Sequence, residues 1–378
     1  MNSSQSGSRK RAKTGKESGT SSSTKKSSAY DPAFKQHLND YGIFKSNRAQ
    51  KPNNWAEINE RLAQPRPSLS PSQFSEAAFE TFQQTNEDAL TKNTVMSKVF
   101  PTIAGTANIP SQENLYFGNL KDLTDSSITK AKPDFYDGAC PVELNKQVRE
   151  QLSEYIEPST KKNAPLLPNF FTEGKGPDGS VPVCELQAMY DGALGARGIH
   201  KLRSYVDPET AYDNNAYTIT STYHGGTGTL TMYTTHTTLS KDPKSSAEYR
   251  MTQLKAFAMT SDPETFRQGA TFLRNGRDLT GDERRELIAA ANAKALNAEN
   301  PGFYSSTQSL VSLSSNEPVH PESETSADEL ALDLGMFHSS NKTSPVPART
   351  KAPPKGSSNG RLKKTSQIKK QPGMSSPI

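Results

Sequence analysis

The chain has 378 residues and a formal net charge of +5; 32% of its residues are hydrophobic, and it holds 26 prolines and two cysteines. That length allows two domains. No apolar run approaches the ~18 residues that a membrane-spanning helix needs, so we expect an intracellular protein with no membrane partner. Cys140 and Cys184 are far apart and form no C-x-x-C pair, which argues against a disulfide framework and a zinc site.

The two ends of the chain differ from the middle in composition and charge. Residues 1–30 carry a net charge of +6 and residues 341–378 carry +9, which leaves −10 for residues 31–340. Both ends are rich in Ser, Lys, Gly or Pro and cannot bury enough apolar surface to offset the entropy of ordering. We therefore predict a disordered basic tail at 1–30, one domain at 31–300 and a disordered Pro/Ser/Lys-rich tail at 301–378.

The basic tails indicate partners. Such segments bind nucleic acid, an anionic surface or an import receptor, or they only keep the chain soluble. Ser8–Lys16 reads SRKRAKTGK and resembles a nuclear localisation signal. We therefore predict a nuclear protein, with the cytoplasm as the alternative, and a nuclear import receptor as a partner of the N-terminal tail.

The middle of the chain alternates between helical and extended patterns. Apolar residues at helical spacing predict a short helix near Ala56–Ala63 and a longer one within residues 70–103. An apolar segment ending at Lys175 predicts a strand, and an alternating pattern around HGGTG at 224–228 predicts a β-hairpin. Further helices are predicted within residues 141–159, 183–205, 247–261, 262–275 and 281–300. The fold class is mixed α/β with few strands.

Three glycines fall at spacing three inside one predicted helix, at Gly192, Gly195 and Gly198. Each interior glycine destabilises a helix by about 1 kcal/mol relative to alanine. Close packing of the helix against the sheet is the simplest reason to keep them. The alternative is that the helix breaks there.

The predicted strand ends in two charges. Side chains alternate between the faces of a strand, so Phe171, Glu173 and Lys175 share one face while Phe170 points to the other. A carboxylate holds a divalent cation, and an ammonium steadies the negative charge of a phosphoryl transition state. Asp134, which follows Pro133, supplies a second carboxylate. The alternative is a strand-end salt bridge and an unrelated turn residue.

These pieces together resemble the PD-(D/E)XK nuclease superfamily, and more closely its branch of fungal nuclease-like proteins. The family pattern is a Pro-Asp with a Tyr-containing turn, a helix, an apolar strand ending in E-x-K, a helix carrying Gln, a hairpin and further helices. The matching segments here are PDFYDG, ELNKQVREQLSEYI, LPNFFTEGKG, LQAMYDGALGARGIHKL and AYTITSTYHGGTGTLTMYTTH, within residues 70–275. The resemblance implies a restriction-endonuclease-like core, with a small mixed sheet flanked by helices.

The resemblance also implies roles for four residues. Asp134 and Glu173 would be ligands of Mg²⁺ (or Mn²⁺), Lys175 the catalytic lysine, and Gln187 a residue that faces the metal or the DNA. Asp137 is the alternative to Asp134.

The family's first helix often adds another acidic metal ligand. Glu76 and Glu80 both fit this place, and we favour Glu80.

Two functions follow as hypotheses. The first is a metal-dependent phosphodiesterase, a nuclease acting on nucleic acid, with DNA favoured over RNA. The second is a catalytically inactive nuclease-fold protein that serves as a nucleic-acid-binding or scaffold module. The charge of −10 on residues 31–340 makes duplex binding by this part alone weak at physiological salt. The tails would then supply affinity.

The N-terminal tail is testable by itself. A reporter fused to residues 1–30 is expected to accumulate in the nucleus because the Lys/Arg cluster of Ser8–Lys16 is accessible. Fluorescence microscopy of living cells measures this, with the Lys and Arg residues of the tail replaced by Ser as the control. A reporter that stays cytoplasmic with the intact tail contradicts the prediction.

Overall fold

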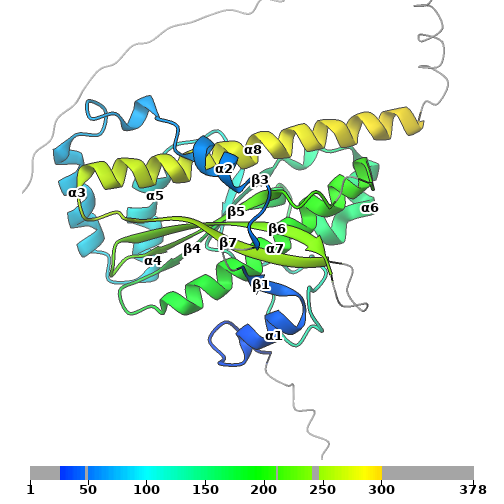
Figure 1. Cartoon of the computed structure of the whole chain (residues 1–378), viewed down its shortest axis with the longest axis horizontal. Helices are drawn as coiled ribbons and strands as arrows, with labels where there is room; N and C mark the ends of the chain where they lie inside the picture. The colour runs from blue at the N-terminus through cyan, green and yellow to red at the C-terminus, as the bar shows by residue number, and fades with distance from the viewer. Residues whose placement is uncertain (1–25, 47–49, 210–211, 241–246, 300–378) are drawn as a thin grey trace, which may run out of the picture. The chain divides into compact units, whose positions relative to one another are not determined.

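The computed structural model describes residues 26–46, 50–209, 212–240 and 247–299 (Figure 1). Apart from residues 26–30, both predicted tails lie outside the described residues, and so does Ser8–Lys16.

A seven-stranded mixed sheet forms the centre, in the order β1-β7-β6-β5-β4-β3-β2. Only the pairs β4/β5 and β1/β7 are parallel. In the order of the sheet, the strands are β1 (Ile43–Lys45), β7 (Ala247–Ala258), β6 (Thr229–Leu239), β5 (Ala216–His224), β4 (Leu166–Lys175), β3 (Phe135–Ala139) and β2 (Ser111–Glu113). The predicted mixed α/β class is confirmed, and so is the hairpin, which is β5 and β6.

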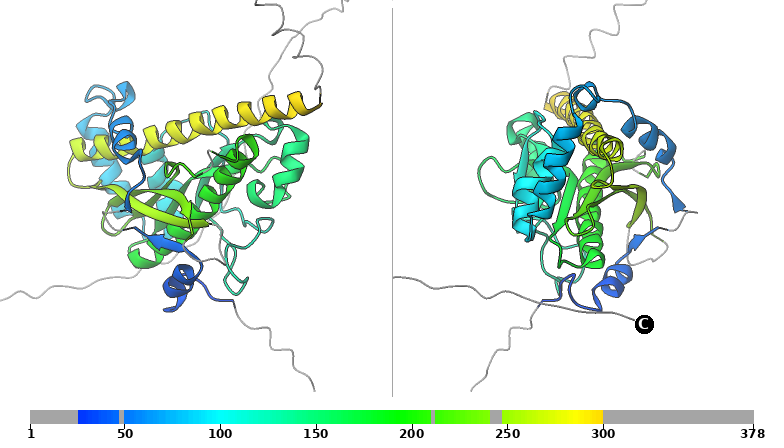
Figure 2. Two further views of the ribbon diagram at one scale, coloured as in Figure 1. Left: turned by 45° about the vertical axis from the view of Figure 1, so that its right-hand side comes forward. Right: turned by 90° about the vertical axis from the view of Figure 1, so that its left-hand side faces the viewer.

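Two long helices cover the two faces of the sheet, α7 (Val181–Val206) on one and α8 (Pro263–Glu299) on the other (Figures 1 and 2). The remaining helices are α1 (Phe34–Asp40), α2 (Trp55–Leu62), η2 (Pro67–Leu69), α3 (Glu76–Glu87), α4 (Lys92–Thr94), the π-helical η3 (Val95–Val99), α5 (Phe100–Ala104), η4 (Pro141–Glu143) and α6 (Lys146–Ile156). Among the described residues, no helix is long and apolar enough to cross a membrane.

Strand β4 connects the two layers. All ten of its residues are buried, and Phe170 and Phe171 are both 0% exposed. Phe170 packs in the cluster that includes Phe272 of α8, whereas Phe171 packs with Met189 of α7. The predicted alternation is therefore confirmed, and it fixes which face of the sheet receives each later side chain of β4.

Helix α7 runs through all three glycines without a break, so close packing is the correct explanation and the predicted alternative is wrong. A Cβ at Gly195 would lie 2.6 Å from Cε2 of Phe171 and 2.9 Å from the carbonyl oxygen of Pro168. A Cβ at Gly192 would lie 2.6 Å from Oγ1 of Thr235. The helix backbone therefore approaches the sheet more closely than any side chain allows.

The long helix predicted within residues 70–103 is divided. Helix α3 ends at Glu87, and a second helical run of α4, η3 and α5 begins at Lys92. Thr91 caps this second run, since its Oγ1 accepts a hydrogen bond from the Thr94 N–H at 3.2 Å. The apolar residues at helical spacing continue across this cap, so they do not reveal it. The cap makes Lys92 the first residue of a helix.

Three segments differ from their predicted form. The segment 247–261 contains strand β7 (Ala247–Ala258) instead of a helix, because pairing with β6 and β1 satisfies backbone groups that β6 would otherwise leave at an open edge. Phe135–Ala139, where the family pattern has a Tyr-containing turn, is strand β3. The two helices predicted after Asp262 are one helix, α8, of 37 residues. Asp262 does cap it, accepting from the Thr265 N–H at 2.8 Å.

Replacing Gly195 by alanine tests the close packing of α7. The added methyl group gains helix propensity but overlaps Phe171 and Pro168, so we expect a net loss of about 1–3 kcal/mol in the free energy of unfolding. Gly276→Ala is the matched control, because its Cβ would meet only ordinary contacts at 3.4 Å or more. That variant is expected to be neutral or to gain up to about 1 kcal/mol. Denaturant unfolding measures both, and equal effects contradict the explanation.

Candidate active site

Asp134 and Glu173, 39 positions apart in sequence, meet where β3 begins and β4 ends. The two strands are antiparallel, with Phe135 opposite Thr172, so Asp134 lies beside the last residues of β4. The Gly174 N–H donates a 2.8 Å hydrogen bond to Oδ2 of Asp134. The two acidic residues are 2% and 1% exposed. Strand pairing thus holds both carboxylates in a buried position.

Lys175 points into the same place. Its Nζ lies 4.0 Å from Oε2 of Glu173 and donates a hydrogen bond to Oε1 of Gln187. Gln187 lies near the start of α7, which Ser180 caps. The structure therefore brings together all four residues that the resemblance implied, with Lys175 and Glu173 on one face of one strand.

Lys92, which the sequence analysis did not single out, completes the charge pattern. Its Nζ lies 2.6 Å from Oδ1 of Asp134 and 3.8 Å from Oε2 of Glu173. Partial burial lowers the pKa of Lys92, but Glu173 and Asp134 outweigh this effect and raise the pKa above its usual value. Lys92 therefore stays charged and acts as a counter-ion to the two carboxyl groups.

Asp191 is the second residue that the sequence analysis missed. It lies one helical turn after Gln187, is 2% exposed, and is within hydrogen-bonding reach of Glu173. Burial raises the pKa of Asp191 to about 7. Burial, together with the charges of Asp191 and Asp134, also raises the pKa of Glu173 well above its usual range. Both pKa values are raised in spite of the nearby ammonium groups, so this pair keeps one shared proton near neutral pH.

A sequence signal for Asp191 exists, but none exists for Lys92. Gln187 and Asp191 are four residues apart and therefore share one face of α7. Asp191 also interrupts an otherwise apolar and glycine-rich helix. Lys92 comes from a segment with no sequence relation to E-x-K, and only the tertiary fold brings it in.

The other candidate acids lie elsewhere. Asp137 is buried in a two-bond ion pair with Arg277 of α8, at 2.8 and 2.9 Å, so it cannot take the place of Asp134. Glu76 and Glu80 are both exposed on α3. The charges that shift the pKa of Glu173 belong to Asp191, Asp134, Lys92 and Lys175. The structure therefore adds no support for Glu80 as a ligand.

A cavity of about 200 Å³ adjoins the buried charges. Glu173, Gln187 and Asp191 line it, together with parts of residues 28–34 and 129–132. Of these lining residues, Tyr30 and Lys132 are exposed. The cluster is therefore buried but adjoins a space large enough for a phosphate-sized group.

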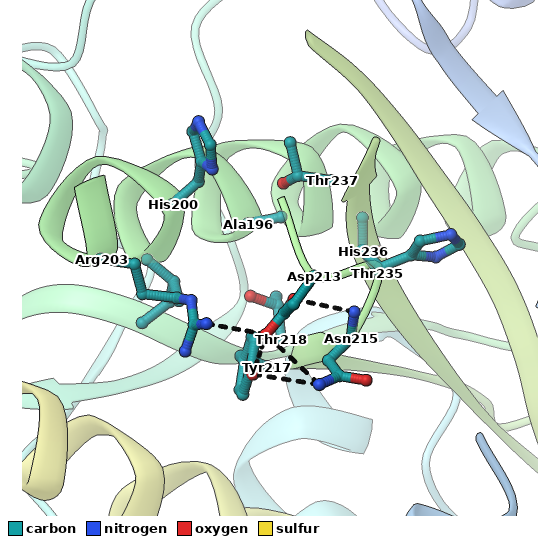
Figure 3. A pocket seen from close by; sticks show the side chains of 11 residues that line it. Ala196, His200, Arg203, Asp213, Asn215, Tyr217, Thr218, Thr235, His236 and Thr237 are labelled. Carbon is teal, nitrogen blue, oxygen red and sulfur yellow. Dashed lines mark hydrogen bonds and ion pairs between the residues drawn. The ribbon is translucent and has the colours of Figure 1, made fainter. Parts of the chain in front are cut away.

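A second polar cavity lies towards the other end of α7 (Figure 3). Asp213 there accepts hydrogen bonds from Arg203 at 2.7 Å and from the hydroxyl group of Tyr217, and His200 and His236 line the same space. That space is about 10 Å³, which suits one water molecule. Gln187 and His200 are roughly 20 Å apart along the helix. This cavity is therefore separate from the carboxylates and too small for a nucleotide.

The donor set at the cluster suits a hard divalent cation. Mg²⁺ takes one or two carboxylates and completes its shell with water and substrate phosphate oxygens. Asp134 and Glu173 both reach one cationic centre, the Lys92 ammonium. Oε2 of Glu173 is buried, and none of the residues that the structure describes donates a hydrogen bond to it. Within the part of the chain that the structure describes, no three His, Cys, Asp or Glu side chains form a metal-binding group. A two-carboxylate site is what these residues can provide.

Comparison of the chain with protein-family models, with curated proteins and with solved structures found no match.

Asp191→Asn tests the buried carboxyl pair. The native protein keeps a proton that the unfolded chain releases, so its stability falls as the pH rises from about 4 to about 7. Asparagine at position 191 carries no titrating proton. The free energy of unfolding of the metal-free wild type is therefore expected to fall relative to that of the variant across this window, as measured by urea unfolding in EDTA.

His236→Asn gives a control of opposite sign. Burial lowers the pKa of His236 from 6.5 to about 4, so here the unfolded chain binds the extra proton. Wild-type stability should fall relative to this variant as the pH decreases from 6.5 to about 4. A pH-independent difference between the wild type and Asp191→Asn contradicts the shared proton.

Proposed function

We propose that this protein is a metal-dependent phosphodiesterase, a nuclease of the PD-(D/E)XK type, acting at the cluster of Asp134, Glu173 and Lys175. The main support is Oε2 of Glu173, a buried carboxyl oxygen that has no hydrogen-bond partner within the described residues but has two ammonium groups at 3.8 and 4.0 Å. A salt bridge at a strand end would be exposed and would need only one cation. Two buried carboxyl groups, those of Asp134 and Glu173, meet where β4 ends and suit a cation site.

Each residue then has a defined task. Asp134 and Glu173 would hold Mg²⁺ (or Mn²⁺), which supplies Lewis acidity towards a phosphate oxygen and a more acidic water when bound. Lys175 stabilises the negative charge that develops on the phosphate or orients the attacking water. Gln187 accepts the hydrogen bond that aims the Lys175 ammonium, and it is therefore a positioning residue.

The substrate class is nucleic acid, with DNA favoured over RNA. The charge of −10 on residues 31–340 disfavours tight duplex binding there, whereas the net charges of +6 on residues 1–30 and +9 on residues 341–378 suit a phosphate backbone. Ser8–Lys16 supports nuclear localisation through an import receptor.

One observation favours the second hypothesis, a catalytically silent nucleic-acid-binding or scaffold protein on the same fold. Lys92 already neutralises Asp134 and Glu173, and a permanent ammonium there would replace the metal. A protein can also keep this fold and these residues after it has lost catalysis. Metal-dependent cleavage separates the two.

Lys175→Ala tests the proposed chemistry in the full-length protein. The wild type is expected to cleave a nucleic acid from a panel of single- and double-stranded DNA and RNA only with Mg²⁺ or Mn²⁺. Loss of the Lys175 ammonium should lower the cleavage rate by at least about 100-fold, the usual effect of removing one charge-stabilising group. Gel-based cleavage rates measure this, and circular dichroism checks the fold.

Two controls accompany this test. Lys98→Ala removes an exposed lysine from η3 and should keep the wild-type rate. Glu173→Ala should be inactive, which excludes a contaminating nuclease. Cleavage by Lys175→Ala at the wild-type rate, or cleavage in EDTA, contradicts the mechanism.

A further inference from the structure

Lys92 has an unusual position among the charged groups of the cluster. Its ammonium is the group that touches both proposed ligands, at 2.6 Å from Asp134 and 3.8 Å from Glu173. Lys175 is directed differently, since it bonds to Gln187 and reaches Glu173 only at 4.0 Å. The Lys92 ammonium therefore lies at the position from which a single cation can contact both carboxylates.

The side chain of Lys92 enters this point from outside. It is 40% exposed, whereas the side chains of Asp134 and Glu173 are 3% and 1% exposed. Strand pairing fixes the backbone of β4, and the Gly174 N–H holds the Asp134 carboxyl group, whereas a long, partly exposed lysine side chain can rotate into solvent. Of the three side chains, that of Lys92 is the most exposed to solvent.

The backbone that carries Lys92 is fixed against β4. A Cβ at Gly176 would lie 2.7 Å from the backbone nitrogen of Lys92, so the chain at positions 91–92 rests directly on the end of the strand. The π-helical η3 follows at Val95, and single π-turns of this kind are rare and recur at functional sites. The local structure therefore holds Lys92 at a defined distance and leaves its side chain free to move.

We propose that Lys92 is an internal counter-ion that occupies the divalent-cation position in the metal-free protein, and that a bound metal displaces its ammonium. The inference rests on the proposed function for the identity of the two metal ligands. It adds that metal affinity is set by competition with Lys92. Removal of the Lys92 charge leaves Asp134 and Glu173 available and increases metal affinity.

Calorimetric titration of the full-length protein with MnCl₂ tests this without reading cleavage. Lys92→Met keeps an unbranched side chain, one atom shorter than that of lysine, and removes the charge. Its Kd for Mn²⁺ is expected to be at least about tenfold lower than that of the wild type, which corresponds to about 1.4 kcal/mol. Lys98→Met, the same change at an exposed residue of η3, should leave the Kd within about twofold of the wild-type value, well inside that tenfold step.

A second measurement uses the wild type alone and so stands even if Lys92→Met fails to fold. Acetylation of lysines, followed by peptide mass spectrometry, reports how accessible each ammonium is. Lys92 is expected to react several-fold faster with saturating Mn²⁺ than in EDTA, while Lys98 reacts equally in both. No increase at Lys92 overturns the proposal.

The calorimetric outcomes are separable from those of the nuclease test. Tighter Mn²⁺ binding by Lys92→Met, or binding seen only in that variant, supports displacement even if no nucleic acid is cleaved. In that case the nuclease proposal falls and the role of Lys92 stands. An unchanged or weaker affinity, or no Mn²⁺ binding by either protein, overturns displacement whatever the cleavage assay shows.

Discussion

The burial of acidic groups at the end of β4 is the constraint on which the rest of this structure depends. Asp134, Glu173 and Asp191 are each no more than 2% exposed, and an isolated buried carboxylate is strongly unfavourable. Two ammonium groups, from Lys92 and Lys175, and a proton shared by Glu173 and Asp191 compensate for them. The five groups come from β4, α7, α4 and the residue that precedes β3, so all four elements must be placed correctly before the cluster is neutral.

The glycines of α7 are part of the same arrangement. A helix whose backbone lies against Phe171 and Pro168 brings its inner face within reach of β4, and on that face Asp191 meets Glu173. With a side chain at Gly195 the helix would lie farther out, and a carboxyl group as short as that of aspartate would not reach. Packing around Gly195 in α7 therefore determines whether Asp191 of the same helix can contact Glu173.

The sequence predicts the parts of the site that depend on local pattern. Alternation along β4 places Glu173 and Lys175 on one face, and helical spacing places Gln187 near the start of α7. Tertiary contacts decide the rest. Ala247–Ala258 form β7 because β6 needs a partner, which no local signal reports. Lys92 reaches the cluster only because its helix packs on Gly176, and the exposure of Glu80 depends on how α3 docks. Long-range packing carries the information that periodicity lacks.

Charge balance connects the metal-free and metal-bound forms of such a site. Three carboxylates are neutralised in the metal-free protein by two ammonium groups and one proton. The two charges of a divalent cation and the one charge of Lys175 would together balance the same three carboxylates. The shared proton and the Lys92 ammonium would then be in excess. Low-dielectric surroundings disfavour any uncompensated charge. A metal ion that enters this cluster should therefore displace the shared proton and the Lys92 ammonium. A protein that has lost catalysis would keep the proton and the ammonium in place. The arrangement of Lys92 and Asp191 thus bears on activity as directly as the E-x-K motif does.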